Sequence, residues 1–446
     1  MGWGTMGNRR FRQVNLVPKS ESQLLKEEYE DDHCDDKIDL ALSVYRSEEG
    51  EPWVPAVVRR VEKMMAVDPS LDHEYHWFSG LEPLTTAVTG LLLGAESRHV
   101  LENKVVTFQS VGGTGALRIG AQFLSKEMGY DTFCVSSPSW GDHEIVFTMA
   151  GFTTVLNYRY WSDVTKSLDI TGLLEDLSKA PENAVVVLQP SAHNPTGCDP
   201  SREQWARIAD VIQRGSFLFR TQEKKLFPFF EVPYQGLASG DLDEDIWPVR
   251  LFADRGLEFM VTYSLSLSTA LYSKYSSENS IEQEESRDER VGALAVVLND
   301  SLDVEVVRTR LQVTVRAMYC SPPAHGAVIA IRTLSDSVNF QEWKSCVRVM
   351  AKRIIDVRQR FRAALEEINT PGCWEHITSQ TGMFSLTGLS HDQVRYLKEK
   401  HHVYLLSSGR YNMCALNDSN IHYVASAVKD AFLSVRAEGG CIKNGA

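Results

Sequence analysis

The segment SVGGTGALRIG has the residue types and the spacing to bind a phosphate group. Gly112, Gly113 and Thr114 stand between a run of β-strand character and a helical pattern. Free backbone N–H groups at the start of a helix attract anions, and glycine lets the backbone approach the ligand closely. The GxGxxG spacing of dinucleotide-binding folds is absent, so a single phosphate group suits this turn better. Glycine-rich turns also occur for packing alone, so the motif needs support from other segments.

Three further clusters carry side chains that could hold a flat heterocycle. They contain Trp140 and His143 in SWGDH, Asn194 in HNPTG, and Glu231 and Tyr234 in PFFEVPYQG. An indole can stack on a ring, a carboxylate can keep a pyridine nitrogen protonated, and a phenol can hydrogen-bond to a ring oxygen. Singly, each has an ordinary alternative, such as a buried tryptophan, a surface histidine or a solvated carboxylate. Because each cluster lies at or just beyond the end of a predicted strand, where open α/β sheets bind ligands, together they indicate one site.

Short strands and helices alternate along the chain and would position these side chains. We predict buried strands at residues 105–110, 132–137, 153–158, 184–189, 226–232, 259–264 and 292–298. Helical patterns lie between most of them, for example at 116–129 and 201–214. This alternation predicts an α/β fold with a mainly parallel sheet wrapped by helices. A long amphipathic helix at 340–368 is predicted to run from this large domain into a smaller one.

The expected domain organisation follows from this pattern. In chain order we predict a flexible leader, an arm that belongs to the small domain, a large domain, a small C-terminal domain and a tail, at residues 1–36, 37–53, 54–345, 346–436 and 437–446. The stretches 215–223 and 273–287 look foreign to the surrounding pattern. The second is rich in serine and glutamate and lacks an apolar period, which predicts a mobile surface loop.

Composition limits the class of protein. With 446 residues, 43% of them hydrophobic, the chain can bury a large core or two domains. Its apolar runs are far shorter than the roughly 20 residues that cross a bilayer, so no membrane span is expected. The formal net charge of −13 argues against nucleic acid as a partner. The 8 cysteines form no CxxC pair, which is typical of reduced thiols in a cytoplasmic protein.

In this order, the segments resemble the class I pyridoxal-phosphate aminotransferases, and among them most closely the cytosolic aspartate aminotransferases. The resemblance runs from about Lys37 to Phe432 and includes GTGALRIGAQFL, SWGDH, HNPTGCDP, YQGLASGDLDEDIW and HHVYLLSSGRYN. It implies fold type I of the pyridoxal-phosphate-dependent transferases, with a seven-stranded, mainly parallel sheet in the large domain and a smaller α/β domain. It also implies the cofactor pyridoxal 5'-phosphate and an obligate homodimer with active sites at the interface.

The resemblance assigns roles to individual residues. For the cofactor phosphate it implies Gly112, Gly113, Thr114, Ser264 and Arg290, with Tyr75 reaching the partner subunit's phosphate. For the cofactor ring it implies stacking on Trp140, a ring carboxylate at Glu231 supported by His143, and oxygen contacts from Asn194 and Tyr234.

The implied substrates are dicarboxylic amino acids and oxo acids. Arg410 matches the arginine that holds the α-carboxylate, and Arg316 matches the one that reaches the distal carboxylate from the other subunit. A guanidinium binds a carboxylate through two parallel hydrogen bonds, which fixes orientation as well as charge. Trp140, Asn194 and Ser43, in the flexible substrate loop, complete the implied substrate site.

The chain departs from the family pattern at the position that matters most for chemistry. In the turn SLSLS the family has a lysine that bonds covalently to the cofactor, and this chain has Leu267. An aliphatic side chain can neither form that bond nor carry a proton. Lys274 offers a second alignment, with the extra residues placed before it. A third reading is that the stretch reflects a misassembled or alternatively spliced transcript.

Smaller departures surround this one. Glu231 replaces the family's aspartate, Gly112 replaces a serine of the phosphate cup, and Ala41 and Ser43 replace glycines of the substrate loop. Two function classes therefore stay open. The first is an aspartate aminotransferase, which moves an amino group from L-aspartate to 2-oxoglutarate and yields oxaloacetate and L-glutamate. The second is a catalytically inactive family member that acts as a binding or dimer-partner protein.

Overall fold

The computed structural model describes residues 14–72, 74–214, 225–271 and 289–435. The stretches 215–223 and 273–287, and with them Lys274, lie outside the described residues.

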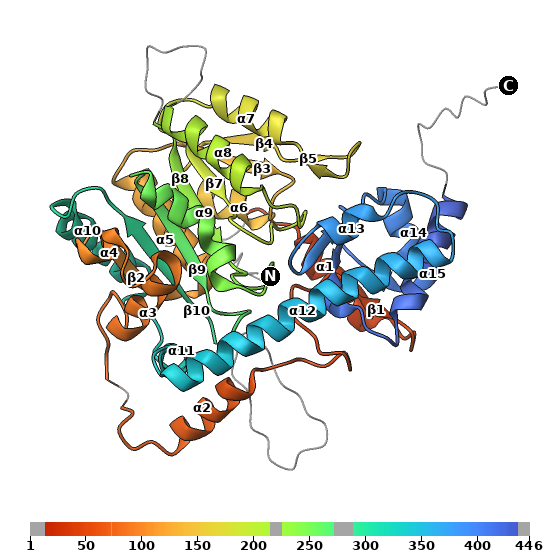
Figure 1. Ribbon diagram of the computed structural model, residues 1–446, viewed down its shortest axis with the longest axis horizontal. Helices are drawn as coiled ribbons and strands as arrows, with labels where there is room; N and C mark the ends of the chain where they lie inside the picture. The colour runs from red at the N-terminus through yellow and green to blue at the C-terminus, as the bar shows by residue number, and fades with distance from the viewer. Residues whose placement is uncertain (1–13, 73, 215–224, 272–288, 436–446) are drawn as a thin grey trace, which may run out of the picture.

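A seven-stranded sheet forms the centre of the molecule (Figure 1). Its strands lie in the order β2-β10-β9-β8-β7-β3-β4. Their bounds are β2 Val105–Val111, β3 Thr132–Ser137, β4 Thr154–Arg159, β7 Val185–Leu188, β8 Phe227–Val232, β9 Phe259–Ser264 and β10 Val291–Val297. β10 runs antiparallel to both neighbours and the other pairs are parallel, so the predicted mainly parallel α/β sheet is confirmed.

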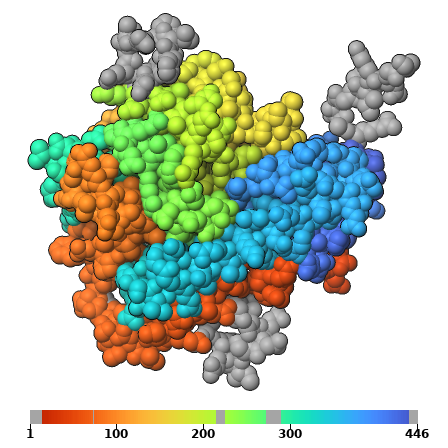
Figure 2. Space-filling view, in the orientation of Figure 1, coloured from red at the N-terminus to blue at the C-terminus, as the bar shows by residue number. Residues whose placement is uncertain are grey.

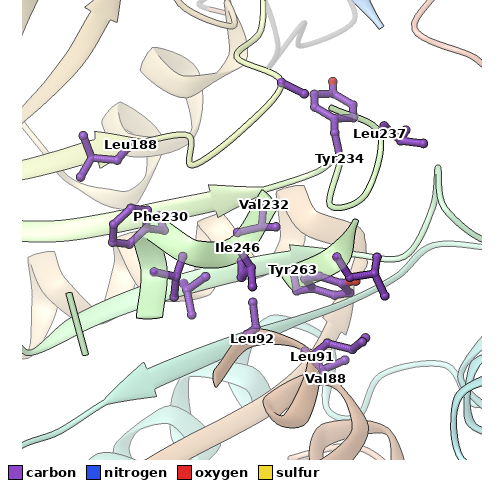
Figure 3. Close-up of a cluster of buried hydrophobic side chains, with 14 of the residues drawn as sticks. Val88, Leu91, Leu92, Leu188, Phe230, Val232, Tyr234, Leu237, Ile246 and Tyr263 are labelled. Atoms are coloured by element: carbon purple, nitrogen blue, oxygen red, sulfur yellow. The ribbon is translucent and has the colours of Figure 1, made fainter. Parts of the chain in front are cut away.

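Helices cover both faces of this sheet, which explains why its central strands β7, β8, β9 and β10 are almost entirely buried. Val185 and Val187 pack with helices α5 (Gly112–Lys126), α6 (Asp142–Ala150) and α10 (Asp303–Tyr319). Val186 and Leu188 point to the opposite face, because successive side chains of a strand alternate. On that face lie α2 (Ala56–Ala66), α3 (Glu82–Leu93), α7 (Ile170–Lys179), α8 (Arg202–Arg214), α9 (Leu242–Asp254) and α11 (His325–Leu334). Figure 3 shows part of this second core, where Phe230 and Tyr263 of the sheet lie near Ile246 of α9 and Leu92 of α3.

The long helix α12 (Ser337–Glu367) links the large body to a smaller one. In Figure 2 its cyan surface passes from the orange and green large body to the blue one. Its N-cap is Asp336, whose side chain accepts a hydrogen bond from the backbone N–H of Asn339 at 2.8 Å. The sequence pattern placed this helix at 340–368, so only its first turn was missed.

The smaller body has its own apolar core, which draws on both ends of the chain. Leu40 packs there against the last turns of α12 and against α14 (His391–His401) and α15 (Ile421–Ser434). Two small sheets support it, β1 (Ile38–Asp39) with β12 (Val403–Tyr404), and β11 (Phe384–Leu386) with β13 (Arg410–Asn412). Short elements complete the described chain: α4 (Arg98–Leu101), β5 (Trp161–Ser162), β6 (Ser167–Leu168), α13 (Glu375–Ser379) and the 3₁₀ turn η2 (Met413–Ala415). The domain boundaries after residues 53 and 345 stay predictions.

Part of the stretch that the sequence pattern assigned to a flexible leader forms a helix, α1 (Glu21–Asp31). Ser20 caps it with a reciprocal pair of bonds to Gln23, which satisfies two N–H groups of the first turn. Leu25 is buried, and Glu28 pairs with Lys398 of α14 at 2.8 Å. Apolar packing and long-range polar contacts therefore order a stretch whose composition is strongly polar. Within the described ranges, no helix is long and apolar enough to cross a membrane.

Candidate functional site

Six residues singled out from the sequence lie at one edge of the sheet. Gly113 and Trp140 follow β2 and β3, and Asn194 follows β7. Glu231 and Ser264 stand at or next to the ends of β8 and β9. Arg290 directly precedes β10, which runs antiparallel to β9, so its start lies at the same edge. The mainly parallel topology thus brings together residues from six strands.

The glycine turn, Ser264 and Arg290 form a compact cradle. A Cβ atom on Gly112 would stand 3.0 Å from Nε of Arg290, and one on Gly113 would stand 3.0 Å from Cβ of Ser264. Gly112 has a φ of +67°, which favours glycine. α5 begins at this turn without a side-chain cap, so its first N–H groups can bind an anion. Backbone N–H groups, a hydroxyl and a guanidinium are suitable donors for a phosphate.

Glu231 is a buried carboxylate held by two donors. It is 7% exposed, and its Oε2 lies 2.7 Å from Nε2 of His143 and 2.7 Å from Nε2 of Gln189. Ser139 Oγ contacts the other nitrogen of His143, Nδ1, at 2.8 Å. Burial alone would raise the pKa of Glu231, but the charge of His143 and the two hydrogen bonds hold the pKa below its ordinary value. The group therefore stays ionised inside the protein and can balance a cationic ring nitrogen.

Gln189 was not identified from the sequence as a site residue. Its amide also accepts a hydrogen bond from the backbone N–H of Asn194 at 2.6 Å, so one side chain links the carboxylate to the HNPTG turn. The available signal was its position as the last residue of the predicted strand 184–189.

The other residues predicted to bind the ring are linked to this carboxylate through His143 and Gln189. Trp140 lies edge-on to His143, with ring centroids 5.3 Å apart. Asn194 donates from Nδ2 to the Tyr234 hydroxyl at 3.3 Å. An indole, an amide and a phenol therefore lie near a buried carboxylate, as the sequence clusters suggested.

Arg410 is a buried cation whose acceptors are all neutral. It is 5% exposed and donates to Asn194 Oδ1 at 3.1 Å, to the Ala41 carbonyl at 2.8 Å and to Ser43 Oγ at 3.4 Å. Its Nε has no hydrogen-bond partner among the described residues. Burial lowers the pKa of Arg410 from its ordinary value, because water no longer stabilises the charge. A guanidinium in this state is well suited to accept a carboxylate ligand.

Among the described residues of one chain, Tyr75 and Arg316 do not contact the residues around Glu231. Tyr75 is 91% exposed, and the segment from Tyr75 to Phe78 lines a cavity of about 370 Å³ together with Cys320 and Ser321. The guanidinium of Arg316 lies 5.5 Å from the centre of the Phe78 ring. In the described residues, neither side chain has a hydrogen bond or ring contact to the residues around Glu231. The resemblance places both at the partner subunit's site.

Leu267 occupies a well-formed turn after β9. It is 8% exposed and packs in the apolar core on the α9 face of the sheet. The turn is held by Thr269 Oγ1, which donates to the Leu265 carbonyl at 2.5 Å, and by Trp343 Nε1, which donates to the Ser268 carbonyl at 2.8 Å. The backbone therefore has defined partners, but the side chain offers no nitrogen. Residues that could bind a cofactor non-covalently are present, and an amine at this position is not.

The chain is similar over most of its length to proteins of known activity. The family described as aminotransferase class I and II matches residues 35–428. The cytoplasmic aspartate aminotransferase of Gallus gallus is 40% identical over 431 residues, which cover 96% of this chain and 99% of that protein. That of Caenorhabditis elegans is 40% identical over 427 residues, covering 96% and 99%.

Solved structures of aminotransferases are also similar to this chain. The aspartate aminotransferase from Saccharomyces cerevisiae cytoplasm superposes with a TM-score of 0.88 at 34% identity, covering 96% of this chain and 99% of that one. The aromatic-amino-acid aminotransferase of Burkholderia pseudomallei, covalently bound to pyridoxal phosphate, superposes with a TM-score of 0.86 at 32% identity, covering 95% and 99%.

Proposed function

The chain belongs to the class I and II aminotransferases, and we propose that it is an aspartate-aminotransferase-like protein that binds pyridoxal 5'-phosphate without a covalent bond. The observation that carries the proposal is the combination of an ordered set of ring, phosphate and carboxylate groups with Leu267 at the family's lysine position.

The cofactor fits the residues present. Its phosphate would lie in the cradle of Gly112, Gly113, Ser264 and Arg290, where added Cβ atoms would crowd the site. Its ring nitrogen would face Glu231, which stays ionised because His143 and Gln189 hold it. When bound, the cofactor supplies an electron sink for a carbanion at the substrate's α-carbon.

The substrate class we propose is dicarboxylic. Arg410 would hold the α-carboxylate, since it is buried, charged and bonded only to neutral acceptors. Arg316 of a second copy would hold the distal carboxylate, and the exposed Tyr75 would approach that copy's phosphate. We therefore propose a homodimer whose sites are complete only at its interface. We propose a cytoplasmic location, as for the relatives named above.

Leu267 limits what this chain can do with these ligands. A lysine at this point would move a proton at the α-carbon, and a leucine cannot, because it has neither a basic atom nor a donor. We therefore propose weak or absent transamination, with ligand binding retained. The alternative is an active enzyme that uses Lys274, which lies outside the described residues.

An absorbance titration with pyridoxal 5'-phosphate, followed by borohydride and mass spectrometry, tests the proposal. We expect the unmodified chain to bind the cofactor and, after borohydride treatment, to release it as the reduced alcohol, with no cofactor mass added to the protein. Leu267→Lys combined with deletion of residues 273–287 should retain the cofactor covalently and exchange amino groups between aspartate and 2-oxoglutarate. Leu267→Met with the same deletion is the matched control and should do neither. Robust activity of the unmodified protein that disappears in Lys274→Ala would contradict the proposal and identify Lys274 as the catalytic lysine.

A further inference from the structure

Helix α1 packs directly on the loop that holds Arg410. Leu25 of α1 forms a small buried cluster with Ala41 and Tyr404, and the Ala41 carbonyl accepts a hydrogen bond from Arg410. Glu28 and Asp32 fix the helix further, through Lys398 at 2.8 Å and His402 at 2.7 Å. α1 and β1 lie together against the smaller body (Figure 1). The helix thus packs against Ala41, a residue that binds Arg410 through its carbonyl.

The first residue of this helix, Glu21, contacts the segment between β12 and β13 that leads to Arg410. Its Oε1 accepts a hydrogen bond from the backbone N–H of Ser407 at 2.5 Å, three residues before Arg410. Ser20 caps the helix through its own hydroxyl and Gln23, so Glu21 is not needed for capping. Its position is therefore set by the loop that carries Arg410.

Glu21 and Arg410 carry opposite charges, and among the described residues neither has an ion-pair partner. Three other acids of α1 pair with lysines: Glu27 with Lys19, Glu28 with Lys398 and Glu30 with Lys26. In the part of the chain that the structure describes, no basic side chain lies within ion-pair distance of Glu21, and no carboxylate within that distance of Arg410. Burial lowers the pKa of Arg410, whereas the nearby Tyr234 and Glu21 act in the opposite direction.

We infer that Glu21 is a specificity-determining residue of the Arg410 site, which favours ligands with an ammonium group beside the carboxylate over ligands with a carboxylate alone. A bound oxo acid brings a full negative charge toward Glu21, and like charges repel. An amino acid brings a carboxylate and an ammonium group on adjacent atoms, so its net interaction with Glu21 is close to zero or attractive. The inference rests on the proposed function, which gives the substrate carboxylate to Arg410.

The substitution Glu21→Gln distinguishes an electrostatic role of Glu21 in ligand specificity from a structural role in holding the Ser407 backbone. The glutamine amide keeps an oxygen that can accept from the Ser407 N–H, and only the charge is lost. Succinate and L-aspartate are suitable probes, because they differ only in the ammonium group. The protein should be saturated with pyridoxamine 5'-phosphate, whose amine does not condense with aspartate, and each probe titrated by calorimetry.

We expect Glu21→Gln to bind succinate roughly two- to fivefold more tightly, the range of exposed charge interactions, with little change for aspartate. The gain should shrink at high salt, because Glu21 is exposed and its charge is screened. Glu30→Gln on the same helix is the matched control and should leave both affinities unchanged. Glu21→Asp, which keeps the charge, should stay close to the unmodified protein.

The outcomes distinguish this inference from the proposed function. If Arg410→Lys weakens succinate binding while Glu21→Gln leaves the succinate-to-aspartate ratio unchanged, Glu21 has no role in specificity and the inference is wrong. If Arg410→Lys does not change succinate binding, or if succinate does not bind at all, the proposed role of Arg410 fails and the inference fails with it.

Discussion

Replacing Gln189 by leucine is expected to destabilise the protein and to remove one of the two donors that hold the Glu231 carboxylate. Leucine has a similar volume, but it removes two hydrogen bonds between buried groups. The first is the 2.7 Å bond to Oε2 of Glu231, and the second is the 2.6 Å bond from the Asn194 N–H.

The expected loss of stability follows from the type of each hydrogen bond. A hydrogen bond to an ionised carboxylate contributes about 1.5–3 kcal/mol, and a buried N–H left without an acceptor costs about 1–3 kcal/mol. Glu231 and Asn194 are both buried, so water cannot replace the lost amide fully. The apolar leucine offsets part of this loss, and we expect the free energy of unfolding to fall by about 3 kcal/mol.

Urea unfolding followed by circular dichroism measures this change, with the m-value as a check that the unfolding transition itself is unaltered. Gln213→Leu is the matched control, because Gln213 is exposed and, among the described residues, its side chain makes a single 3.4 Å bond, to the Arg255 carbonyl. That variant should stay within about 0.5 kcal/mol of the unmodified protein. If Gln189→Leu also stays within 0.5 kcal/mol, Gln189 does not hold the carboxylate as described and the reasoning is refuted.

Three further predictions concern the same edge of the sheet. Arg316→Leu should weaken binding of a dicarboxylate such as 2-oxoglutarate by roughly 2–5 kcal/mol and leave alanine binding nearly unchanged, and equal losses for both ligands would exclude the distal-carboxylate role. Gly112→Ala should lower the free energy of unfolding by about 1–2 kcal/mol, because a φ of +67° is strained for alanine. The added Cβ would contact Arg290, so the affinity for pyridoxal 5'-phosphate in a fluorescence titration should also fall. An unchanged affinity would argue against the cradle as the phosphate site. Since the folded pKa of Glu231 lies below its ordinary value of 4.5, its stabilising contribution is fully present above that pH and is lost as pH falls through the folded pKa. The stability difference between the unmodified protein and Glu231→Gln should therefore be constant from pH 7 to about pH 5 and change only below about pH 4.5, whereas a difference that changes between pH 7 and pH 6 would show a different titrating group.

Much of this fold could be predicted from local sequence patterns. Strands such as Thr132–Ser137 and Phe259–Ser264 have the same bounds in the structure as in the pattern, because strands that are apolar on both faces must be buried between helices. The glycine turn at the start of α5 and the polar residues at strand ends could also be identified from the sequence, because they border these apolar runs. The sequence alone shows that position 267 holds a leucine, and no tertiary contact can give this side chain a basic atom.

Tertiary structure decided the electrostatics of the site. Arg410 and Asn194 are 216 residues apart in the sequence, and Gln189 and Glu231 are 42 apart, so no local pattern pairs them. Likewise, α1 looked like a leader because its composition is polar, although Ser20 and Gln23 carried a local capping signal. Its place near Arg410 depends on Leu25 packing against Ala41 and Tyr404, which are distant in the sequence from Leu25 or from each other. Secondary structure follows from short-range preferences, whereas which charges meet depends on packing between elements that only the folded chain brings together.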